Sequence, residues 1–175
     1  MVASVLTAAA VAMALTPAAS PHTGHPATCA RQSGASFSRA FAKRDNLVVG
    51  PLAMIGARRA TPADLVAELG GMKYPMLVRP RHTVTARIRG LAPGAASLFY
   101  AHSGSLTERR VEDGHRAITF RPCGPRRAQS DVDGDPVTFW SGFVLVSEPM
   151  CVPLRITVDD RRPRLRHISL GRSCP

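Results

Sequence analysis

The chain has 175 residues and a formal net charge of +11, from 23 Lys and Arg against 12 Asp and Glu. This length fits a single domain, and 45% hydrophobic with 20% charged residues excludes a chain that is disordered throughout. No segment recurs at a period of about 20–50 residues, which excludes solenoids and propellers. The basic residues are 21 arginines and only two lysines, Lys43 and Lys73.

Residues 1–20 have the pattern of a secretory signal peptide. Residues 2–15 are small or apolar and carry no charge, and 16–21 supply prolines and the small residues of a cleavage region. The apolar run is shorter than the about 20 residues that a membrane-spanning helix needs. We therefore expect a secreted protein of the extracellular space or cell envelope, with no transmembrane span after cleavage; an uncleaved anchor is the alternative.

The cysteine content agrees with export. An even number of cysteines in an exported chain predicts two disulfide bonds, and no pair has the C-x-x-C spacing of a zinc or redox site. The four cysteines are Cys29, Cys123, Cys151 and Cys174.

The expected order of the mature chain is a tail, one helix and a series of strands. Residues 21–44 are rich in Ser, Ala, Gly and His, so we expect a flexible N-terminus with one short helical turn, followed by a single domain over 45–175. The helix is predicted where Thr61 supplies a cap residue, Pro62 the first helical position and Asp64 a carboxylate three residues after the cap. It should end at the two glycines that follow Leu69.

Short strands account for the remainder of the domain. Residues 46–56 and 137–146 are apolar on both faces, typical of buried strands, the first interrupted at Gly50-Pro51. Five further segments are candidate strands, several with clean alternation: 81–89, 96–101, 117–121, 152–158 and 164–170. The pattern predicts an antiparallel, immunoglobulin-like β-sandwich with one short helix and two disulfides. Alternation excludes an all-parallel sheet.

The parity of Cys151 bears on the disulfide pairing. It is out of phase with the inward residues of strand 152–158, so it faces away from the sandwich core. If this strand forms a hairpin with 164–170, Cys151 lies near Cys174. We therefore favour Cys29–Cys123 with Cys151–Cys174, and the two other pairings stay open.

The C-terminal region contains four short motifs: F-R-P-C-G-P at 120–125, W-x-G-F at 140–143, C-V-P-L at 151–154 and L-G-x-x-C at 170–174. Together they resemble a group of small exported β-domain proteins of high-GC actinobacteria. The resemblance implies a secreted or surface-attached β-domain and carries no catalytic residues. In that group two glycines usually follow the tryptophan, whereas this chain has Ser141-Gly142.

Candidate metal ligands are few. Three carboxylates at alternate positions resemble the start of a calcium loop: Asp131, Asp133 and Asp135. Pro136 and Gly142 occupy the positions where that loop requires Gly and Glu, so a solvated turn is the favoured interpretation. His22, His25 and Cys29 suit zinc or copper, but an oxidised cysteine leaves too few ligands for a structural site. We expect no metal.

Catalytic motifs are absent from the sequence. It contains no G-x-S-x-G elbow, no H-E-x-x-H pair and no glycine-rich phosphate loop. We therefore expect a non-enzymatic protein without a cofactor. A small secreted hydrolase or inhibitor, with a site built from dispersed loops, is the alternative.

The arginines are the remaining indication of a partner. Arg87, Arg89 and Arg155 have outward strand parities, where guanidinium groups can bind phosphate or carboxylate bidentately. Export argues against nucleic acid, which leaves an anionic cell-wall polymer, lipid headgroups or an acidic protein as expected partners. The favoured interpretation of the charge as a whole is that it keeps the protein soluble. We expect an extracellular or cell-envelope interaction protein of unknown partner, with these three arginines as its candidate anion-binding site.

Overall fold

The computed structural model describes residues 24–29, 35–100 and 108–175. The expected signal peptide lies outside these ranges. No helix among the described residues is long and apolar enough to cross a membrane. The helical elements are α1 (Ala63–Leu69) and the short 3-10 helices η2 (Val111–Asp113) and η3 (Pro125–Arg127). The strands are β1 (His25–Ala27), β2 (Leu47–Val49), β3 (Leu52–Met54), β4 (Gly71–Lys73), β5 (Met76–Val78), β6 (Val84–Ile88), β7 (Ala96–Phe99), β8 (Ala117–Phe120), β9 (Ser130–Val132), β10 (Asp135–Trp140), β11 (Phe143–Val146), β12 (Met150–Val158) and β13 (Arg164–Leu170).

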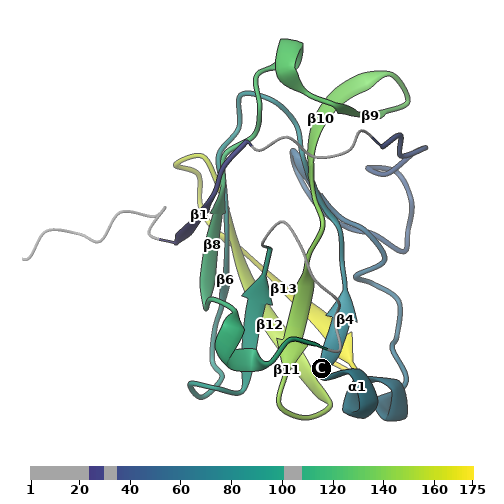
Figure 1. Ribbon diagram of the computed structural model, residues 1–175, viewed down its shortest axis with the longest axis vertical. Helices are drawn as coiled ribbons and strands as arrows, with labels where there is room; N and C mark the ends of the chain where they lie inside the picture. Colours follow the sequence, from purple (N-terminus) through teal and green to yellow (C-terminus); the bar gives the residue numbers. More distant parts are fainter. Residues whose placement is uncertain (1–23, 30–34, 101–107) are drawn as a thin grey trace, which may run out of the picture.

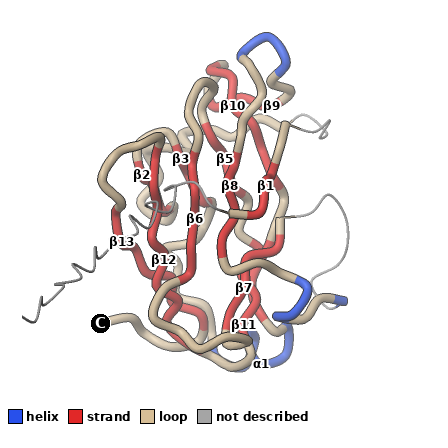
Figure 2. The backbone as a smooth tube through the Cα atoms, turned by 90° about the vertical axis from the view of Figure 1, so that its left-hand side faces the viewer, coloured by secondary structure: helices blue, strands red, loops and turns tan. Residues whose placement is uncertain are grey.

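These strands form three sheets. Sheet I has the order β1-β8-β6-β12-β13, sheet II has the order β2-β3-β5-β10-β9, and sheet III has the order β4-β11-β7. In Figure 1 the sheet I strands β1, β8 and β6 lie on one side of the molecule and β10 and β4 on the other. Figure 2 faces sheet I. Among the described strands all pairings are antiparallel except that of β1 with β8. The predicted class, antiparallel sheets with one α-helix and two disulfides, is confirmed.

Sheets II and III join into one layer because two strands run through both. The β4–β5 segment is interrupted at Tyr74-Pro75 and the β10–β11 segment at Ser141-Gly142, and the Tyr74 N–H donates to the Gly142 carbonyl at 2.9 Å between the two breaks. The predicted single strand over 137–146 is therefore divided between two sheets.

Gly142 is required at this break by its close packing. A Cβ atom there would lie 2.2 Å from the ring of Tyr100, whose hydroxyl donates to the Tyr74 carbonyl at 2.8 Å. The Tyr100 ring packs edge-on against Phe120, which packs in the same way against Trp140, with 5.2 Å between ring centroids in both pairs. This cluster fills the centre of the core, and only a residue without a side chain fits beside it.

The predicted helix is present but lacks the predicted cap. Helix α1 begins after Pro62 without a side-chain cap, because the hydroxyl of Thr61 instead hydrogen-bonds the hydroxyl of Tyr74 at 3.2 Å. Its end agrees with the prediction: Gly70 has φ 66°, and its N–H donates to the carbonyl of Val66.

Two hairpins frame one open edge of the sandwich. The predicted interrupted strand over 46–56 is a hairpin, since β2 and β3 pair antiparallel through a two-residue turn. Gly50 has φ 56° there, as the first central position of a tight hairpin turn requires. The predicted 152–158 and 164–170 strands form the second hairpin, β12–β13.

Part of the N-terminal segment that composition predicts to be flexible is ordered in the fold. β1 pairs with β8, the N–H of Phe37 donates to the Asp131 carbonyl at 2.9 Å, and Ala40 is buried. Backbone pairing and a few apolar contacts hold these residues, neither of which leaves a periodic pattern in the sequence.

The structure contains the favoured disulfides. Cys29 is bonded to Cys123, with Cα atoms 4.8 Å apart, and Cys151 to Cys174, with Cα atoms 5.0 Å apart. The first closes a loop of 94 residues and ties β1 to the end of β8, and the second closes a loop of 23 residues beside the C-terminus.

Candidate functional site

The outer face of sheet I brings the three predicted arginines together. β6 and β12 are neighbours, and Arg87 is the register partner of Arg155. The Arg89 N–H donates to the Pro153 carbonyl at 3.0 Å. Because hydrogen-bonded pairs recur at every second residue of an antiparallel ladder, Arg87 and Arg155 also form such a pair, with Cα atoms about 5.5 Å apart.

The outward strand positions of sheet I that the structure describes carry arginines and no carboxylate. Inward residues such as Ile88 and Leu154 are buried in the core, whereas Arg89 and Arg155 are exposed and Arg87 is half-buried. The outward positions of β8, β6, β12 and β13 include no Asp or Glu. We call the group Arg87, Arg89 and Arg155 the arginine face.

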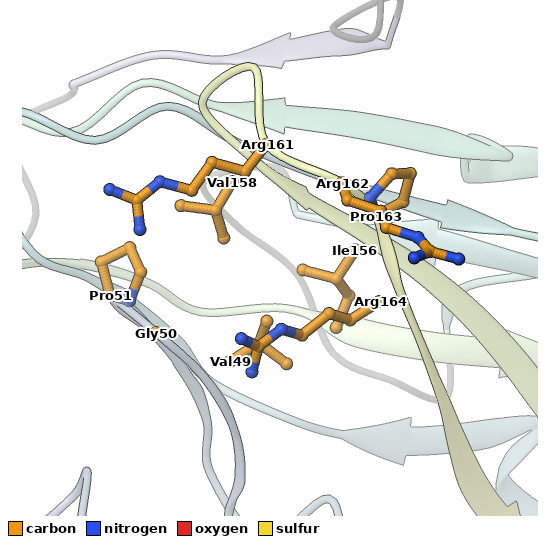
Figure 3. A pocket seen from close by; sticks show the side chains of 9 residues that line it. All are labelled: Val49, Gly50, Pro51, Ile156, Val158, Arg161, Arg162, Pro163 and Arg164. Carbon is orange, nitrogen blue, oxygen red and sulfur yellow. The ribbon is translucent and has the colours of Figure 1, made fainter.

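A pocket opens at the other side of β12, between the two hairpins. Its volume is about 460 Å³. It is lined by nine residues from the β2–β3 turn, the inner side of β12 and the β12–β13 turn: Val49, Gly50, Pro51, Ile156, Val158, Arg161, Arg162, Pro163 and Arg164. The floor is apolar, three arginines surround it and none of the nine is a carboxylate. We call it the edge pocket (Figure 3).

Asp159, at the start of the β12–β13 turn, is engaged on the β6 side. Asp159 Oδ2 lies 3.0 Å from His82 Nδ1, and Asp159 Oδ1 accepts a hydrogen bond from the Thr83 N–H at 3.0 Å. The hydrogen bond with His82 is the main reason that the pKa of the Asp159 carboxyl lies below its usual value; Thr83 and the charge of Arg161 add to it. Asp159 has φ 48°, which starts the turn.

A histidine pair marks a second, smaller cavity of about 250 Å³ beside β1. The rings of His25 and His115 stack with 3.7 Å between centroids and an interplanar angle of 10°. Burial, followed by the proximity of His25, lowers the pKa of His115. No group of three or more His, Cys, Asp or Glu is placed to hold a metal ion in the described parts of the chain.

The aspartates of the calcium-like motif form a hairpin turn. Asp133 and Gly134 have φ of 53° and 89° between β9 and β10, as a two-residue Asp-Gly hairpin turn requires. Asp131 Oδ1 accepts hydrogen bonds from the Ser36 hydroxyl and the Gly134 N–H, both at 3.0 Å, and Asp133 Oδ2 accepts one from the Arg39 N–H at 2.9 Å. Asp135 begins β10. The motif thus forms a turn between β9 and β10, and two of its carboxylates hold the segment before β2.

Sequence reasoning located the arginine face but not the edge pocket. Val49 and Pro51 are separated from Arg161 and Arg164 by more than half of the chain, so only the packing of two sheets brings them together. The local signal was the run Arg161-Arg162-Pro163-Arg164, which reads as a charged turn. No known protein family, curated protein or solved structure matches the chain.

Proposed function

We propose that this protein is an exported, non-enzymatic binding module whose arginine face binds an anionic cell-wall polymer. Export is supported by the two disulfides, since such bonds persist in oxidising compartments. The outward parity of the arginines in an antiparallel sheet supports binding at a surface rather than within a cleft.

The pairing of Arg87 with Arg155 is the observation that carries this proposal. Two arginines at directly opposite positions of neighbouring strands, with Arg89 just beyond the end of β6 about 7 Å further along the chain, offer a row of donors for phosphate or carboxylate oxygens. The outward positions of β6 and β12 hold no Asp or Glu. Small ligands favour concave sites, whereas this open face suits a chain with repeating charges.

The experiment measures retention of the protein on purified cell wall at low and high salt. Wild-type protein should be retained at low salt and released at high salt, because exposed charges are screened. Soluble polyphosphate should compete and neutral dextran should not. The variant Arg89→Gln with Arg155→Gln should weaken retention about tenfold or more, since charge-assisted hydrogen bonds contribute about 1.5–3 kcal/mol each.

The matched control is Arg126→Gln with Arg127→Gln. These exposed arginines lie in η3, outside sheet I, and the change removes the same two charges. Retention of this variant should stay within about threefold of wild type. Equal loss in both double variants, or retention that does not depend on salt, would contradict a specific arginine face.

A further inference from the structure

We infer that the edge pocket binds an amphiphilic anion, a small molecule with a carboxylate or phosphate head and an apolar tail. This site is separate from the arginine face: Arg155 projects from the outer side of β12, whereas the pocket residue Ile156 projects from the inner side. The two sites therefore differ in both location and ligand shape.

The floor of the pocket accounts for the apolar tail. Val49 and Ile156 belong to the buried cores of two facing sheets, and Val158 is half-buried at the end of β12. Pro51 and Pro163, from the two hairpin turns, complete the apolar walls. A volume of about 460 Å³ falls within the about 300–1,000 Å³ of small-molecule sites, and an apolar tail there would be removed from water.

The arginines account for the acidic head. In Figure 3 the guanidinium of Arg161 reaches toward Pro51, whereas Arg162 points away from Val49 and Pro51; Arg164 also lines the pocket. Asp159 accepts its hydrogen bonds from His82 and Thr83. A carboxylate or phosphate between Arg161 and Arg164 would accept paired N–H donors from guanidinium groups.

The position of Arg164 also has a second explanation, which the experiment must distinguish from ligand binding. Arg164 is the register partner of Ile156, so its side chain leaves the edge strand β13 on the inner side of sheet I. Inward charges on edge strands also prevent sheet-to-sheet aggregation. If that is the role of Arg164, its replacement changes self-association and leaves amphiphile binding unchanged.

The experiment titrates the full exported chain with decanoate and, separately, decyl phosphate, both below their micelle concentrations. Binding is followed by calorimetry and by backbone amide chemical shifts. We expect shifts at Val49, Gly50 and Val158. Acetate and inorganic phosphate, which lack the tail, and decyltrimethylammonium, which has the opposite charge, should each bind at least tenfold more weakly. The two acids distinguish a free fatty acid from a phosphorylated lipid as the better ligand.

Arginine variants test whether Arg161 and Arg164 bind the acidic head specifically or whether any positive charge in this turn has the same effect. Arg161→Gln with Arg164→Gln should weaken decanoate binding at least tenfold, while Arg162→Gln, in the same turn, should change it less than threefold. Sedimentation of each variant reports self-association. The inference is overturned if decanoate gives no shifts in the pocket, if all decyl compounds bind equally, or if the double variant self-associates with unchanged decanoate affinity.

The same variants keep this inference distinguishable from the proposed function. Arg89→Gln with Arg155→Gln should retain decanoate binding, and Arg161→Gln with Arg164→Gln should retain cell-wall binding within about threefold. Loss of decanoate binding in the arginine-face variant would overturn the assignment of the amphiphile to the edge pocket.

Discussion

Arg87 on β6 and Arg155 on β12 are direct cross-strand partners on the outer face of sheet I. Like charges placed opposite each other in an antiparallel pair are destabilising, by up to about 1 kcal/mol. An anion bound between the two guanidinium groups would offset this repulsion.

Removal of one partner should separate stability from binding. Arg155→Gln is expected to leave the free energy of unfolding unchanged or raise it by up to about 1 kcal/mol, because it relieves the repulsion. The same variant should bind polyphosphate more weakly than wild type. Urea unfolding with a parallel binding titration measures both; a loss of more than about 1 kcal/mol would show that Arg155 has a structural role instead.

Gly142→Ala should destabilise the fold by about 1–3 kcal/mol, the usual cost of inserting an atom into a packed core. The added Cβ would lie 2.2 Å from the Tyr100 ring, and that ring cannot withdraw without disturbing Phe120. Gly124→Ala is the control, because nothing lies within 4 Å of its Cβ position and its φ is −61°. In thermal unfolding, the stability of the control should stay within about 0.5 kcal/mol of wild type. An unchanged midpoint for Gly142→Ala would show that the interruption at Ser141-Gly142 can widen to accommodate the added methyl group.

The two disulfides should contribute unequally. In the chain-entropy description, a loop of 94 residues contributes about 4.7 kcal/mol and one of 23 residues about 3.4 kcal/mol. Replacing both Cys29 and Cys123 by Ala should therefore destabilise more than the same change at Cys151 and Cys174. Denaturant unfolding of the two variants tests the order, and the reverse order would show that β1 adds little to the folded state.

The hydrogen bond between Asp159 and His82 should affect how the stability of the fold changes at low pH. Because the folded state lowers the pKa of Asp159 below its usual 3.8, the stabilisation is fully present above that value and is lost as pH falls through the lower pKa of the folded state. Asp159→Asn, which tolerates the left-handed φ of this turn, should be less stable than wild type at pH 6. The difference should shrink as the pH falls below about 4. A difference independent of pH would attribute the effect to the backbone alone.

Local patterns predicted part of the fold well. The residue patterns predicted the strands β12 and β13, and the parity of Cys151, with a hairpin of these two strands as the condition, favoured its bond to Cys174. Both inferences depend on neighbouring residues. The division of 137–146 between two sheets could not be predicted, since it depends on the contact of Gly142 with Tyr100, which lies far away in the sequence.

Of the two candidate sites, the sequence could likewise predict one and not the other. Outward parity identified Arg87 and Arg155 because a strand alternates with a period of two. The edge pocket depends on the meeting of two hairpins from opposite halves of the chain, so no local pattern could predict it.

The central claim is that an anionic polymer lies on the arginine face, and amide chemical-shift mapping with short-chain polyphosphate tests it most directly. The account predicts that the largest shifts fall on residues 85–89, in β6 and directly after it, and on residues 153–157 of β12. These shifts should decrease with added salt and disappear in the Arg89→Gln, Arg155→Gln variant. Shifts concentrated on η3, or spread evenly over all exposed arginines, would contradict it.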